Sequence, residues 1–114
     1  MSAFADDDHP LLMITTLPSR ESAQALAREA VQRRLAACVQ IQAIDSVYRW
    51  QGEVCEEAEW RLLLKTTQAR QAALAALIAE LHPYDLPALL SLPVQWAEPG
   101  FAAWIADAVR DPQG

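Results

Sequence analysis

The chain has 114 residues, of which 53% are hydrophobic, and a formal net charge of −6. This length suits one domain that can bury a core of its own without disulfides or a structural metal. The excess of carboxylates argues against binding to a phosphate backbone, and two cysteines are too few for a disulfide framework or an all-cysteine metal cage.

The first ten residues, MSAFADDDHP, include three successive aspartates, and we expect them to form a disordered tail before a single domain over residues 11–112. They contain neither the basic region nor the apolar stretch of a signal peptide. No segment reaches the roughly 20 apolar residues that a membrane helix needs. We therefore expect a cytoplasmic protein with reduced thiols and no membrane partner.

The first half of the domain predicts a strand, a helix and a long hairpin. Residues 11–16 form a short apolar run typical of a buried strand, and Ser19 is a suitable helix N-cap. The helix after it has an apolar face at helical spacing, made of Ala23, Leu26, Ala27, Ala30 and Val31. Residues 36–50 alternate as a strand does, Gln51-Gly52 indicates a turn, and a second long strand follows.

The second half predicts a helix, a strand and a terminal helix. A helix begins after Thr67 and Gln68 and ends at HPYDLP, residues 82–87. Its apolar stripe consists of Ala73, Leu74, Leu77, Ile78 and Leu81. Residues 88–96 read as a strand, in which Pro93 indicates an edge position or a break. A last helix opens near Pro99, with an apolar face made of Phe101, Trp104, Ile105, Ala108 and Val109.

This order of elements predicts an α+β fold, the ferredoxin-like βαββαβ sandwich, with a long hairpin between the second and third strands and a C-terminal helix. Two helices should cover one face of a four-stranded antiparallel sheet.

The hairpin is too long for these helices to cover. Fifteen strand residues reach about 50 Å, whereas a 14-residue helix spans about 21 Å. The uncovered part of the hairpin contains Tyr48, Trp50 and Val54, and Leu63 lies on the uncovered face of the sheet. Exposed apolar surface of this kind is removed when further copies of the chain cover it, so we expect a homo-oligomer.

This chain lacks the residues that several activities found on this fold require. Two cysteines cannot hold an iron–sulfur cluster, no Cys-x-x-Cys pair suits a soft-metal chaperone, and no glycine-rich loop could cradle a phosphate. No Ser-His-Asp set can be assembled, and we assign no catalytic residue. The side chains that remain as site candidates are Cys38, Tyr48, Trp50, Glu59, Lys65, His82, Tyr84 and Asp85.

Each candidate also has a purely structural interpretation. Cys38 at a strand start suits a small core position, and Lys65 suits a solvated strand face. His82 at a helix C-terminus complements the helix dipole, and Pro83 cannot extend that helix. From the residues alone, HPYDLP is either a helix stop or the edge of a binding site.

Five segments resemble, in order, those of the CutA family of divalent-cation-tolerance proteins, over about residues 11–110. They are RLAACVQI (34–41), SVYRWQGEV (46–54), EWRLLLKTT (59–67), LHPYDLPALLSLPV (81–94) and FAAWI (101–105). The resemblance implies a homotrimer of ferredoxin-like protomers, similar to PII signalling proteins, in which the long hairpins join sheets between neighbours. It also implies that HPYDLP is both a helix stop and a wall of a cleft between subunits.

The resemblance places the candidate residues in this cleft and implies a copper(II) or other divalent-cation ligand. We expect His82 to bind the ion, with Cys38 or Glu59 as a helper. The chain departs from the family's pattern at three positions. Thr15 stands where some members have a first-strand cysteine, Leu81 stands where a second histidine would precede the proline, and Asp85 replaces a glutamate.

Four functions follow as hypotheses. The first is a metal-binding protein in divalent-cation homeostasis. The second is a PII-like sensor or scaffold in which Lys65 binds a small anionic metabolite, with Tyr48 or Trp50 as a stacking surface. An enzyme, with a hydrolase-type activity built on Lys65, Glu59 and His82, has no supporting motif. The fourth is a stable trimer that binds an unidentified protein partner.

Overall fold

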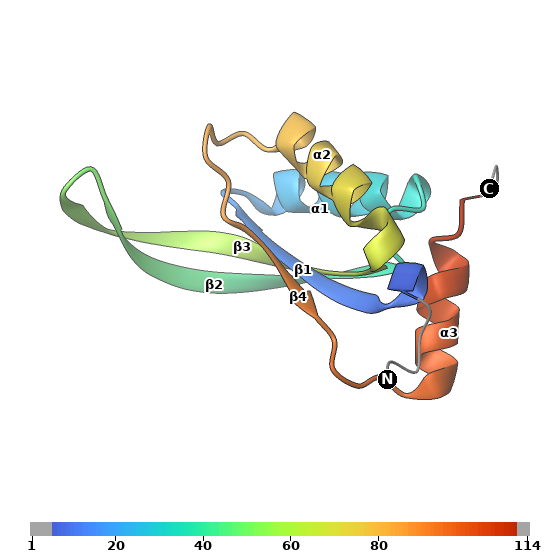
Figure 1. Cartoon of the computed structure of the whole chain (residues 1–114). Helices are drawn as coiled ribbons and strands as arrows, with labels where there is room; N and C mark the ends of the chain where they lie inside the picture. The colour runs from blue at the N-terminus through green and yellow to red at the C-terminus, as the bar shows by residue number, and fades with distance from the viewer. Residues whose placement is uncertain (1–5, 112–114) are drawn as a thin grey trace.

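The computed structural model describes residues 6–111 (Figure 1). Its elements in chain order are a 3₁₀ turn η1 (Asp6–Asp8), β1 (Pro10–Leu17), α1 (Arg20–Gln32), β2 (Cys38–Trp50), β3 (Glu53–Thr67), a 3₁₀ turn η2 (Gln68–Arg70), α2 (Gln71–Leu81), β4 (Leu89–Pro93) and α3 (Pro99–Ala108). This is the predicted βαββαβ order followed by a terminal helix.

The four strands form one antiparallel sheet in the order β2-β3-β1-β4. Helices α1 and α2 cover one face of this sheet, and α3 lies across one end of it (Figure 1). The buried core lies between the two helices and the sheet, and β1 at its centre contributes Met13 and Leu17. The other core residues are Ala23, Leu26, Ala30, Ala36, Leu62, Leu64, Leu74, Leu77 and Ile78.

Local signals in the sequence set the boundaries of several elements. The Ser19 hydroxyl accepts a hydrogen bond from the Ser22 amide at 3.1 Å and so caps α1. Gln51 and Gly52 have φ values of 50° and 80°, the conformation of a tight two-residue hairpin turn. The carboxylate of Glu98 accepts from the amides of Gly100 and Phe101 at the start of α3.

The hairpin projects far beyond the body of the domain. β2 and β3 remain paired from Cys38 opposite Lys65 to Trp50 opposite Glu53, whereas β1 ends at Leu17, opposite Trp60. The part of the hairpin beyond Trp60 therefore extends about 20 Å past the end of β1, at roughly 3.3 Å per residue. It is visible as the long arm in Figure 1.

The predicted strand boundaries differ from the structure at both ends of the chain. The last strand ends at Pro93 instead of residue 96, since proline has no N–H for a further ladder bond, although the Val94 amide still bonds to the Pro10 carbonyl at 3.0 Å. At the other end of the chain, β1 runs from Pro10 to Leu17, one residue beyond the predicted strand on each side, and the His9 carbonyl before it accepts from the Gln68 amide at 2.9 Å. Residues 1–5 of the predicted tail lie outside the described residues.

Several residues predicted on apolar helix faces are exposed in the single chain. Val31 of α1 is 43% exposed, Leu81 of α2 39%, and Phe101 and Trp104 of α3 40% and 47%. Ala73 is exposed as well, because α2 turns only Leu74, Leu77 and Ile78 towards the core. Within residues 6–111, no helix combines the length and the apolar character needed to cross a membrane.

The core contains one polar atom without a partner. The Thr15 hydroxyl is fully buried on the helix-covered face of β1 and has no hydrogen-bond partner among the described residues. Thr66, equally buried on β3, differs because its hydroxyl donates to the Leu35 carbonyl at 2.7 Å. A buried hydroxyl without a partner lowers the stability of the fold, because it loses its hydrogen bonds to water and gains none in the protein.

We therefore expect Thr15→Val, which replaces the hydroxyl with a methyl group of similar size, to raise the free energy of unfolding by about 1 kcal/mol. The matched substitution Thr66→Val should lower it by about 1 kcal/mol, because it leaves the Leu35 carbonyl unpaired. Denaturant unfolding of both variants at one protein concentration measures the two shifts. A loss of stability in Thr15→Val would mean that its hydroxyl has a partner.

Candidate functional site

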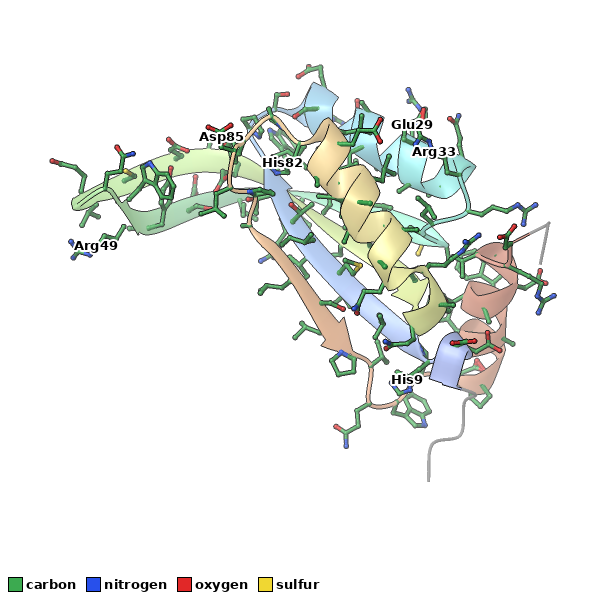
Figure 2. All side chains as sticks on the ribbon, turned by 45° about the horizontal axis from the view of Figure 1, so that its top comes forward. His9, Glu29, Arg33, Arg49, His82 and Asp85 are labelled. Carbon is green, nitrogen blue, oxygen red and sulfur yellow. The ribbon has the colours of Figure 1, made fainter. Side chains whose placement is uncertain are left out.

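His82 ends α2 and is held by backbone groups on both sides of its ring. It is buried, its Nε2 lies 2.6 Å from the carbonyl oxygen of Thr16 in β1, and its Nδ1 accepts from the Tyr84 amide at 3.1 Å. Both contacts are satisfied only if the ring proton is on Nε2 and the lone pair is on Nδ1. His82 therefore ties the HPYDLP segment to the end of β1, beside the start of the hairpin arm (Figure 2).

Tyr84 connects this segment to the hairpin. Its ring lies 5.0 Å from that of His82, tilted by 52°. Burial raises the pKa of the Tyr84 hydroxyl, and the charges of Glu59 and Glu57 and a hydrogen bond to Glu59 raise it further. Glu59 itself is 8% exposed and belongs to β3 just beyond the end of β1.

A second tyrosine and a second glutamate repeat this pairing further along the hairpin. A hydrogen bond to Glu57 raises the pKa of Tyr48 to about 12, with smaller contributions from burial and from the charges of Glu57, Cys55 and Glu59. By strand alternation Tyr48, Glu57 and Glu59 lie on the sheet face opposite the helices. We call Tyr48, Glu57, Glu59, His82 and Tyr84 the root group.

Cys38 and Lys65 lie at the other end of the sheet. They are direct cross-strand neighbours. The Gln40 side-chain Nε2 donates to the Cys38 sulfur at 3.7 Å, and the Lys65 Nζ lies 5.4 Å from the centre of the Phe101 ring in α3. We call Cys38 and Lys65 the base group. Along β3 the six residues from Lys65 to Glu59 span about 20 Å, and along β2 the ten residues from Cys38 to Tyr48 span about 33 Å, so one chain cannot bring the two groups into one cleft.

The two remaining candidates stand apart from both groups. Trp50 is at the tip of the hairpin and 49% exposed. Asp85 is exposed on the HPYDLP segment and has no hydrogen bond or ion pair within the described part of the chain.

A metal site inside one chain does not fit this arrangement. Nowhere in residues 6–111 do three or more histidine, cysteine or carboxylate side chains gather closely enough to hold an ion. Cys38 and His82, the predicted ligand pair, lie at opposite ends of the sheet, and both His82 nitrogens already bond to the backbone. His82 can become a ligand only if one of these bonds opens.

Two contacts of the site were missing from the sequence interpretation. Glu57 was not predicted, although its alternation with Glu59 on the strand could have placed both carboxylates on one face. The Thr16 carbonyl is a backbone group, and no side-chain pattern indicates that His82 would bond to it.

Comparisons with known proteins give one family for nearly the whole chain. The family model described as CutA1 divalent ion tolerance protein matches residues 11–108. The divalent-cation tolerance protein CutA of Thermus thermophilus is 39% identical over 97 residues, which are 84% of this chain and 94% of that protein. The chloroplastic CutA protein of Arabidopsis thaliana is 34% identical, over 89% of this chain and 56% of that protein.

Solved structures agree in fold. The crystal structure of CutA from Xylella fastidiosa superposes with a TM-score of 0.87 at 34% identity and covers 93% of this chain and 100% of its own. The family match, the sequence identity and the shared fold agree, and the chain belongs to the CutA1 divalent ion tolerance family.

Proposed function

We propose that this protein is a cytoplasmic homotrimer that binds copper or another divalent cation in metal-ion homeostasis, without a catalytic step of its own. Its membership of a family named for divalent ion tolerance supports the metal. The observation that carries the assembly is the division of the candidate residues into a root group and a base group, whose members on β3, Glu59 and Lys65, are about 20 Å apart in one chain.

The exposed apolar surface of the single chain supports this assembly. On the sheet face opposite the helices, Leu90 is 63% exposed and Leu92 is 47% exposed. Leu90 pairs with Ile14 across the sheet, and Ile14 pairs in turn with Leu63. Trp50 at the hairpin tip adds a further exposed aromatic ring. Copies related by a cyclic axis bury such faces, and the hairpin arm of one copy can then bring its root group to the base group of a neighbour.

The trimer is tested by light scattering on the untagged protein at micromolar concentration. We expect three times the chain mass of 12.6 kDa. Leu90→Lys combined with Leu92→Lys should shift the mass towards the monomer, since it places ammonium groups in an apolar interface. Ala76→Lys, an exposed position on α2, is the matched control. A wild-type protein that stays monomeric would rule out the assembly.

The proposed cleft offers metal ligands that one chain keeps apart. Cys38 of one copy supplies a soft thiolate, Glu59 of the next supplies a carboxylate, and His82 can join them if the Tyr84 amide moves away from Nδ1. This set favours copper over magnesium or calcium, which prefer all-oxygen ligands.

Calorimetric titration with Cu(II) and Zn(II) tests the metal role. The protein should be compared with a variant that lacks residues 1–8 and has His9→Gln, which removes the aspartates of the tail but keeps the residue 9 carbonyl bonded to Gln68. We expect binding near one ion per subunit to survive this change and to weaken at least about tenfold in Cys38→Ser, which removes the thiolate. Binding that vanishes with the tail, or is absent throughout, would contradict the proposal.

One observation favours the alternative, a PII-like sensor or scaffold for a small anion. Lys65 belongs to the base group, and its ammonium lies over the Phe101 ring without a carboxylate in ion-pair distance among residues 6–111. A cation without such a partner in a cleft suits an anionic metabolite or an acidic segment of a protein partner.

Thermal-shift screening against carboxylate and phosphate metabolites tests this alternative. A ligand of the cleft should raise the unfolding temperature of the wild-type protein and not that of Lys65→Gln. Arg61→Gln is the control, because Arg61 lies on the same face of β3, four residues from Lys65, and its guanidinium donates to the Gln42 side chain. Equal stabilisation of the wild type and of Lys65→Gln would remove Lys65 from the site.

A further inference from the structure

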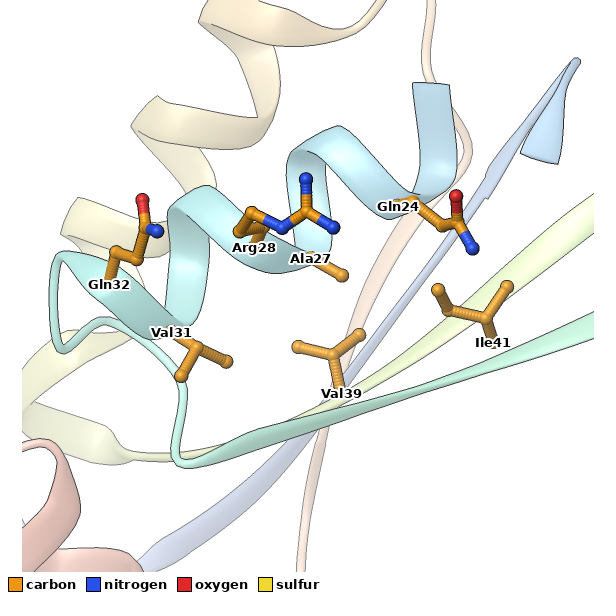
Figure 3. Close-up of a pocket in the computed structure, with 7 residues that line it drawn as sticks. All are labelled: Gln24, Ala27, Arg28, Val31, Gln32, Val39 and Ile41. Atoms are coloured by element: carbon orange, nitrogen blue, oxygen red, sulfur yellow. The ribbon is translucent and has the colours of Figure 1, made fainter. Parts of the chain in front are cut away.

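A groove of about 330 Å³ lies between α1 and the outer strand β2 (Figure 3). Its floor is apolar, because strand alternation turns Val39 and Ile41 towards α1, and Val31 of the helix, which is 43% exposed, completes the row. Three polar side chains of α1 form its rim, namely Gln24, Arg28 and Gln32. An apolar hollow of this size with a few polar groups beside it is the usual form of a small-molecule site.

The groove and the candidate metal cleft lie on different faces of the sheet. Cys38 and Lys65 alternate with Val39 and Leu64 along the paired strands, so they face the side opposite the helices. None of the residues that line the groove belongs to the root group or the base group. A ligand of the groove and the metal proposed above therefore occupy separate sites.

Arg28 gives the rim of the groove a positive charge. The two ion pairs of the described residues join Arg33 to Glu29 and Arg110 to Asp107, and neither involves Arg28. Arg28 is also exposed. Its guanidinium is therefore accessible to an anion from solution and has no carboxylate of residues 6–111 to displace.

The charge is not centred on the apolar row, which gives the groove two unlike ends. Figure 3 shows the Arg28 guanidinium directed along the helix towards Gln24, on the side of the groove where Ile41 lies. From there the apolar row continues through Val39 to Val31. One end thus combines a cation with an amide, and the other offers aliphatic side chains.

We propose that this groove binds an aliphatic carboxylate, a small molecule with one anionic head and an apolar chain. The Arg28 guanidinium donates two parallel hydrogen bonds to the carboxylate, and the Gln24 side-chain amide donates another. The chain lies over Ile41, Val39 and Val31, where it removes apolar surface of both partners from water. The site therefore binds the whole amphiphile better than its head or its chain alone.

Methyl NMR of the valine and isoleucine side chains tests the site, with octanoate below its micellar concentration as the probe. We expect saturable shifts of the Val31, Val39 and Ile41 methyl signals. Val47 and Val54 of the arm, 66% and 63% exposed, are the controls for unspecific adsorption and should not shift. The affinity should rise about two- to threefold with each methylene from butyrate to octanoate, because each one covers more of the row.

Two results of this titration contradict the proposal. The first is the absence of a saturable shift at the three groove residues. The second is a shift of the same size at Val47 and Val54, since octanoate would then coat exposed apolar side chains without a defined site.

Arg28 variants and an uncharged probe test the carboxylate contact. Arg28→Gln should weaken octanoate binding about fivefold or more and leave octan-1-ol binding unchanged, because only the acid loses a charged partner. Arg28→Lys should give an intermediate loss, since an ammonium group keeps the charge without the two-pronged geometry. Arg34→Gln removes the same charge outside the groove and should change neither affinity. Equal losses in Arg28→Gln and Arg34→Gln would remove the carboxylate from this end of the groove.

A second copy of the chain is the other candidate to cover this surface. Intermolecular NOEs test it, in a sample refolded from a mixture of isotope-labelled and unlabelled chains. We expect none from the Val31 and Ile41 methyl groups to the unlabelled copy. Such contacts would mean that the groove is already filled and that the ligand site is wrong, whereas the metal cleft on the other face would be unaffected.

Discussion

The mismatch in length between the β2–β3 pairing and the rest of the sheet is the constraint on which the structure depends. β1 supports β3 only as far as Trp60, and the hairpin continues beyond it with paired backbone groups and no core beneath them. A two-stranded ribbon without a packed face is marginal in water. The exposed valines and aromatic side chains of the arm therefore have no packed surface beneath them in the single chain.

His82 connects this constraint to the candidate site. By bonding to the Thr16 carbonyl and accepting from the Tyr84 amide, it fixes the segment after α2 at the point where β1 ends and the arm begins. Tyr84 then reaches the buried Glu59 on β3. The same histidine that ends a helix thus positions the carboxylate and tyrosine side chains of the root group.

Much of the fold could be predicted from local patterns. Ser19, Gln51-Gly52 and Pro99 act through their immediate neighbours. With Leu63 predicted on the uncovered face, strand alternation puts its neighbours Leu62 and Leu64 on the core face, where both are buried. The outer faces of α1 and α3 could not be assigned in this way. Val31 and Trp104 follow the helical period as well as buried residues do, and their exposure depends on β2 being an edge strand and on where α3 lies.

The strand order also has a consequence for how the chain reaches its native state. The hairpin closes through a two-residue turn, so its contacts are local and can form within microseconds. β1, one of the two inner strands, pairs with β3 some fifty residues later and with β4 beyond that, and such distant pairings form slowly because long loops must close first. In a newly made chain the hairpin contacts therefore form faster than the pairings that complete the core, and the strand edges are unpaired in the interval, when wrong partners can pair with them.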